Sequence, residues 1–193
     1  MTEPVGKFPV RVTQASFPNR QRVSDRTDLV LEIKNAGKRL IPDLAVTIYT
    51  GETKADNPFS IRLDRPDLAT PNKPVWILEN NYPKLLEGGV DLSNVSRAPT
   101  GGATAAQTDT FQFGPLKPGR SKKIDWRVTP ALSGTYTVHY RVAAGLQGNA
   151  KAVTPDGGPV KGEFVVTITS KPPQTCVTPS GAITQGRCQL SGP

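Results

Sequence analysis

The sequence is poor in the residues that most often carry chemistry. Its 193 residues include one histidine, one methionine and two cysteines. One histidine cannot build a histidine-based metal site, and two thiols without further ligands do not make a tetrahedral zinc site. The nucleophile motif G-x-S-x-G and the phosphate loop G-x-x-x-x-G-K-[ST] are both absent. We therefore expect no enzyme active site, no metal and no cofactor.

Long apolar runs are missing as well. No run approaches the about 20 apolar residues of a membrane-spanning helix, and residues 1–10 lack the apolar region of a signal peptide. No segment has the periodicity of an amphipathic helix, whereas proline and glycine are frequent, at 19 and 18 residues. Such frequent chain breaks favour short strands joined by turns.

What the chain does contain is alternation of apolar and polar residues with period two, which is typical of half-buried strands. In one segment, Trp126 is expected to face inward and its neighbours Asp125 and Arg127 outward. Because a sheet must bury its apolar face against another layer, we predict an all-β, immunoglobulin-like antiparallel β-sandwich of about seven strands. The seven segments lie at about residues 8–13, 28–34, 44–48, 111–113, 123–128, 136–142 and 164–168.

Four aromatic side chains on these segments are predicted to interdigitate between the two sheets: Trp126, Tyr136, Tyr140 and Phe164. The single histidine, His139, is expected to point outward beside Arg141 as a solvated residue of the sheet face. Since histidine catalysis needs a convergent nucleophile and acid, and the sequence singles out neither, we assign His139 no catalytic role.

The sandwich is predicted to occupy residues 1–170, with a long insertion at 51–108. This insertion is rich in proline and has one convincing apolar run, which contains Trp76. Because loops often carry binding on rigid scaffolds, Trp76 and Tyr82 are the candidate ligand-binding residues, as an aromatic platform for a glycan or peptide. The alternative is that Trp76 packs the insertion against a sheet edge.

Residues 171–193 are expected to form a loosely ordered tail. Cys176 and Cys188 lie twelve positions apart within it, and they could close a small disulfide loop; two free thiols are the alternative. A bridge would require an oxidising compartment. We expect such a compartment, with an export segment outside this chain.

The formal net charge is +8, from 24 basic and 16 acidic residues. A dedicated nucleic-acid surface concentrates its charge and adds stacking aromatics, but here the basic residues are scattered. We therefore expect no specific binding of nucleic acid, and a weak attraction to anionic envelope polymers or lipid headgroups. The two small basic clusters are Arg20, Arg22 and Arg26, then Lys117, Arg120, Lys122 and Lys123.

Three motifs resemble a known family. The stretch from Gly134 to Val138, G-T-Y-T-V, resembles the corner of immunoglobulin-like domains where a tyrosine hydroxyl folds back onto upstream backbone. Together with L-V-L-E-I-K-N-A-G at 29–37 and L-K-P-G at 116–119, it is similar to the bacterial cell-adhesion-related (CARDB-type) family. The resemblance implies an exported, envelope-associated, non-catalytic protein, and it supplies no binding residues to transfer.

These observations predict a non-enzymatic, extracytoplasmic interaction or structural module of the bacterial cell envelope. Its partner would be a protein or glycan of the envelope, bound through the insertion loop or a sheet edge. The alternative function is a carbohydrate-binding or accessory domain of a polysaccharide-processing system.

Overall fold

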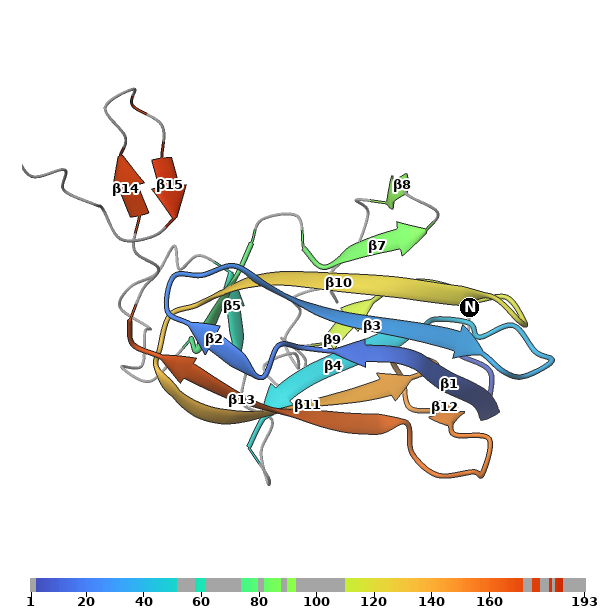
Figure 1. Ribbon diagram of the computed structural model, residues 1–193. Coiled ribbons are helices and arrows are strands. Elements are labelled where there is room, and N and C mark those ends of the chain that lie inside the picture. Colours follow the sequence, from blue (N-terminus) through green and yellow to red (C-terminus); the bar gives the residue numbers. More distant parts are fainter. Residues whose placement is uncertain are drawn as a thin grey trace, which may run out of the picture.

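A computed structural model of the chain shows two facing β-sheets and a separate small hairpin (Figure 1). Within the described residues the regular elements are fifteen strands. None of these residues belongs to a helix with the length and apolar character needed to cross a membrane. The structure describes residues 3–51, 58–61, 74–79, 82–87, 90–92, 110–171, 175–177, 181 and 183–185.

The larger sheet has the strand order β12-β1-β3-β10-β6-β5, with β7 also paired to β10 and β8 paired to β7. Strands β3 and β10 form its centre, where Trp126 lies opposite Leu29 in an antiparallel register. The strands are β1 (Gly6–Ser16), β3 (Thr27–Asn35), β5 (Phe59–Ile61), β6 (Trp76–Leu78), β7 (Lys84–Glu87), β8 (Val90–Leu92), β10 (Ser121–Pro130) and β12 (Ala150–Val153).

The smaller sheet has the order β2-β13-β11-β4-β9. Its strands are β2 (Arg20–Arg22), β4 (Ala45–Thr50), β9 (Thr110–Gln112), β11 (Gly134–Ala143) and β13 (Lys161–Thr169). A two-stranded sheet of β14 (Thr175–Val177) and β15 (Ile183–Gln185) follows it in sequence. The region predicted to be a loosely ordered tail thus contains a hairpin.

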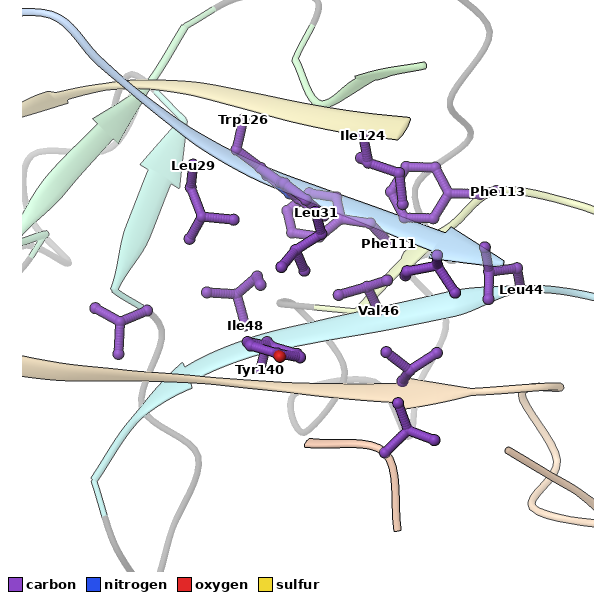
Figure 2. Close-up of a cluster of buried hydrophobic side chains, with 14 of the residues drawn as sticks. Leu29, Leu31, Leu44, Val46, Ile48, Phe111, Phe113, Ile124, Trp126 and Tyr140 are labelled. Atoms are coloured by element: carbon purple, nitrogen blue, oxygen red, sulfur yellow. The ribbon is translucent and has the colours of Figure 1, made fainter. Parts of the chain in front are cut away.

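The core lies between the two sheets, whose apolar side chains point toward one another (Figure 2). Trp126 is completely buried, with its ring centroid 5.9 Å from that of Phe111 and 5.8 Å from that of Phe113. Of the other rings predicted to interdigitate, Tyr140 is buried, whereas Tyr136 and Phe164 are partly buried against the same core. The predicted immunoglobulin-like sandwich is therefore confirmed.

The structure adds strands that the alternation of residues did not predict. All seven predicted segments are strands, but so are β2 and β12, which pair in parallel with β13 and β1. The described parts of the predicted insertion also form strands, and β6 and β7 pair with β10 to extend the larger sheet. Runs of three or four residues are too short to reveal a period of two, which explains why they were missed.

Two of the sequence motifs, N-A-G and L-K-P-G, meet at one buried side chain. Asn35 is 1% exposed, and its Nδ2 donates to the carbonyl oxygens of Arg39 and Leu116, each at 2.9 Å. Its Oδ1 accepts from the backbone amide of Gly37 at 2.9 Å. The amide therefore ties the turn that follows β3 to the loop that precedes β10.

The third motif forms the predicted tyrosine corner. The Tyr136 hydroxyl donates to the backbone oxygen of Ser133 at 3.0 Å, which closes the turn where β11 begins. On the same strand, Tyr140 lies opposite Gly162 of β13. A Cβ atom at position 162 would come within 2.5 Å of the Tyr140 ring, so glycine is what allows the ring to lie across the neighbouring strand.

Candidate functional site

Trp76 does not form a surface platform, which corrects the expectation for this residue. It is 0% exposed, and its ring packs against Phe17 and Tyr136, with centroid distances of 5.5 and 5.6 Å. Its Nε1 donates to Oε1 of the buried Gln21 at 2.7 Å. Trp76 thus joins β6 of the larger sheet to β2 and β11 of the smaller one, which matches the packing alternative and leaves no ring face for a ligand.

Tyr82 is partly buried and already has two cations beside its ring. The Lys84 ammonium lies 4.9 Å from the ring centroid, and the Arg127 guanidinium lies 5.1 Å from it. Cations near an aromatic face are held by the ring quadrupole, so the ring is occupied within the protein. The structure places Tyr82 and Trp76 in different surroundings, and they do not form one aromatic surface.

Asp125 was expected to be solvated, but it is only 6% exposed. The reason is β7, which pairs with β10 so that Lys84 lies opposite Asp125. One carboxylate oxygen of Asp125, Oδ1, is buried without a hydrogen bond. Burial, reinforced by the nearby charge of Asp28, raises the Asp125 pKa to about 6, while Arg127 and Lys84 oppose the rise.

The charges of Asp28 and Asp125 interact, but the two residues do not form a catalytic pair of carboxyl groups. Asp28 accepts from Arg127 Nε at 2.9 Å in an ion pair, and hydrogen bonding to Asp28 raises the Arg127 pKa. A glycosidase-like mechanism needs one carboxylic acid and one carboxylate that both reach the substrate. Here the Asp28 carboxylate is engaged by Arg127, and the Asp125 carboxylate is buried.

The basic cluster at 117–123 forms the candidate binding site, which we call the basic hollow. It has a volume of about 650 Å³ and lies beside the first residues of β10. Its wall contains four basic side chains and one acidic one, Glu32. The lining residues are Glu32, Leu86, Pro115, Leu116, Lys117, Gly119, Arg120, Ser121, Lys122 and Lys123.

The four basic residues of the hollow differ in their burial. Lys117 and Arg120 are exposed, and Lys123 is half-buried beside Glu32, its partner in register on β3. Lys122 is 9% exposed and donates from Nζ to the backbone oxygen of Phe113. Lys122 therefore anchors the wall, Lys117 and Arg120 face the solvent, and Lys123 is partly accessible.

Positive charge continues from the hollow across the larger sheet. Arg11 of β1, Lys34 of β3 and Ser121 of β10 lie side by side in register. Side chains directly opposite one another on neighbouring strands share a face, and both Arg11 and Lys34 are exposed. A row of like charges thus adjoins the hollow, which sequence clusters alone did not indicate because these residues are far apart in the chain.

His139 lies on the outer face of the smaller sheet in a row that crosses three strands. Its ring stacks on Tyr49 with a centroid distance of 5.1 Å, and its Nδ1 lies 3.4 Å from a carboxylate oxygen of Glu163. Both contacts join residues that are partners in register. The imidazole is half-buried within this row rather than freely solvated.

Of the two cysteines that were predicted to form a disulfide, the structure describes Cys176. Cys176 lies in β14, opposite Thr184 of β15, and is disulfide-bonded. Cys188, the other cysteine of the sequence, lies outside the described residues. In the described part of the chain, no three histidine, cysteine, aspartate or glutamate side chains gather as metal ligands would.

No protein-family model matches the chain, and no curated protein matches it significantly. Its structure is similar to that of the CARDB domain of the PF1109 protein from Pyrococcus furiosus, with a TM-score of 0.44 and 12% identity over 89% of this chain and 99% of that one. A cohesin module from a Clostridium perfringens family 33 glycoside hydrolase has a TM-score of 0.45 and 9% identity, over 85% and 98% of the two chains. AvmM, which catalyses macrocyclization in alchivemycin A biosynthesis, has a TM-score of 0.43 and 12% identity, over 86% and 90%. These are similarities of fold, and the CARDB domain, which the sequence motifs resemble, is among them.

Proposed function

We propose that this protein is a non-enzymatic, extracytoplasmic interaction module of the bacterial cell envelope, and that it binds an anionic envelope polymer at the basic hollow. The charge of the hollow carries the proposal, because four basic side chains line it against Glu32 alone. Two of those cations, on Lys117 and Arg120, are exposed to the solvent, and Lys123 is half-buried. A concave wall of one sign of charge attracts and concentrates ligands of the opposite sign.

An extended ligand suits this surface better than a single small anion. The hollow continues into the row of Arg11 and Lys34, so the positive charge extends over neighbouring strands. Like charges directly opposite each other destabilise a sheet by about 0.2–1 kcal/mol. A polymer with repeated negative charges would offset that cost at several positions together. The hollow lies beside the first residues of β10 and Leu86 of β7, so binding would use the face of the sheet at the start of this strand.

Two features favour an anionic polymer over single-stranded nucleic acid and over a neutral glycan. Single-stranded nucleic acid is held by aromatic stacking as well as by charge, and the lining residues described for the hollow include no aromatic side chain. The glycan-binding alternative depended on an open platform at Trp76, and that ring is buried. We therefore do not carry this alternative forward.

The disulfide of Cys176 supports a location outside the cytoplasm. Disulfides persist in oxidising compartments and are rare in the cytosol. The test is to count reactive thiols in denatured, non-reduced protein recovered from its native host. We expect none, whereas two reactive thiols would contradict an oxidising compartment.

The binding proposal can be tested with purified glycerol-phosphate teichoic acid as the probe and uncharged dextran as its control. We expect saturable binding of the teichoic acid that weakens steeply as salt rises, because screening shortens the reach of surface charge. The triple variant K117Q/R120Q/K123Q should bind at least about tenfold more weakly, given about 1 kcal/mol for each basic residue near an anionic surface.

A matched control variant separates the hollow from net charge. R20Q/R22Q/K161Q removes the same three charges from exposed positions on β2 and β13. It should retain most of the affinity. Equal loss in both variants would show that only total charge matters and that the hollow is not the site. Binding of dextran as tight as that of teichoic acid would contradict a site that selects an anionic polymer.

A further inference from the structure

Strand β12 forms one edge of the larger sheet, where it pairs with the start of β1 (Figure 1). A second hollow lies at this edge. Its volume is about 670 Å³, and its wall is shared by β12, the end of β11 and the beginning of β4. A volume of about 300–1,000 Å³ is usual for small-molecule sites. We call it the β12 hollow.

The wall of the β12 hollow is largely made of small apolar side chains. Ala45, Val142, Ala150 and Val160 are all buried and form its inner side. Leu146, in the loop between β11 and β12, is partly exposed at its rim. An apolar wall of this kind favours hydrocarbon over water, because burying apolar surface releases about 25 cal/mol per Å².

The charged residues of the β12 hollow are of one sign. Lys7, Arg141 and Lys151 line it and are exposed, and its lining includes no aspartate or glutamate. They come from three different strands, β1, β11 and β12. An anionic group at the mouth of the hollow would therefore meet cations from several sides.

The wall is also held in place by a specific contact. The two oxygens of the Glu3 carboxylate accept hydrogen bonds from the backbone amides of Gln147 and Ala150. These two bonds hold the loop before β12 in place. A Cβ atom at Gly145 would overlap the Glu3 carboxylate, so a residue without a side chain is needed at this position. Gly145, Leu146 and Ala150 all line the hollow, and this contact therefore shapes it.

We propose that the β12 hollow binds an anionic amphiphile, with its alkyl chain against the apolar wall and its acidic head beside Arg141, Lys151 and Lys7. The head can be the carboxylate of a fatty acid or the phosphate of a lipid, because guanidinium and ammonium groups bind both. This site is separate from the basic hollow and does not depend on the function proposed there.

The test is calorimetric titration of the full chain with four probes below their micelle concentrations: dodecanoate, dodecyl phosphate, neutral dodecyl maltoside and short-chain acetate. We expect saturable binding of at least one of the first two, with their ratio distinguishing a fatty acid from a lipid phosphate. The maltoside should bind about tenfold more weakly, as expected for loss of one charge-assisted contact. Acetate should not bind, because it lacks the alkyl chain.

Two variants locate the site. R141Q/K151Q should weaken binding of the charged probe by about tenfold or more, and L146N should weaken binding of both the charged and the neutral probe. Thermal melting of each variant checks that it is folded. The control is K117Q/R120Q/K123Q, which alters the basic hollow and should bind the charged probe as wild type does.

Several results would overturn the proposal. If neither anionic probe bound, the proposal would be wrong. Equal affinity for the neutral maltoside would also contradict it, because it would indicate a nonspecific apolar surface. Unchanged affinity in folded R141Q/K151Q would place the amphiphile elsewhere.

Discussion

Replacing Asn35 by leucine should destabilise the sandwich by about 3 kcal/mol. Leucine has a similar volume, so the change removes the polar contacts and leaves the packing nearly intact. The side chain of Asn35 makes three hydrogen bonds, to the oxygens of Arg39 and Leu116 and from the amide of Gly37. Each is worth about 1 kcal/mol net. The Leu116 oxygen keeps its bond from the Ile41 amide, which limits the loss at that position.

This loss is a large share of the about 5–15 kcal/mol that stabilises a typical domain. For a chain of this size it corresponds to a melting temperature lower by about 6–12 °C. Urea unfolding followed by tryptophan fluorescence measures it directly, because Trp76 and Trp126 are fully buried and become exposed on unfolding. The dependence of free energy on urea should keep its slope, since the exposed area hardly changes.

Two companion variants sharpen the test. N35D keeps the shape but replaces two N–H donors by a carboxylate facing two carbonyl oxygens, so it should be less stable than N35L at neutral pH. It should regain stability as the pH falls, because a protonated acid can donate one bond again. K38A, at an exposed position in the same turn, should stay within about 0.5 kcal/mol of wild type. If N35L matched K38A, the side chain of Asn35 would not join the two loops energetically.

Three further predictions concern other contacts. Y136F should cost about 0.5–1.5 kcal/mol in urea unfolding, because it removes the bond to Ser133; no change would mean that the corner contributes only shape. G162V should cost about 1–3 kcal/mol and alter the near-ultraviolet circular dichroism, because its side chain displaces the Tyr140 ring; an unchanged spectrum would contradict that packing. The folded pKa of Asp125, about 6, exceeds the unfolded value, so its contribution to stability is present at low pH and is lost as the pH rises through 6. D125N should remove this fall, which is at most about 3 kcal/mol, and parallel melting curves of the two proteins between pH 4 and 7 would refute it.

The strongest sequence predictions came from long alternating segments. Trp126 and Tyr140 are buried as their positions in the alternation predict, since side chains on a strand point to opposite faces in turn. The tyrosine corner could be predicted for a similar reason, because Tyr136 and Ser133 are three residues apart and their contact is local.

Predictions for isolated residues failed where a distant strand intervened. Asp125 alternates correctly with its neighbours, but it is buried where β7 pairs with β10, and no residue near Asp125 in the chain predicts that pairing. Trp76 had two interpretations, and the choice depended on whether Phe17 and Gln21 would reach it from another part of the chain. Trp76 and Tyr82 therefore do not form the binding site that was predicted for them.

The order of residues along the sequence is enough to predict an all-β protein whose sheets each have an apolar face. The reason is that consecutive residues of a strand point to opposite faces, so the alternation appears directly in the sequence. Both hollows depend instead on pairing between distant strands. Arg11 lies opposite Lys34 only through the register of β1 with β3, and Lys7 lies opposite Lys151 only because β12 pairs with the start of β1. Surface charge has no periodicity to read, and only tertiary contacts decide which cations share a wall.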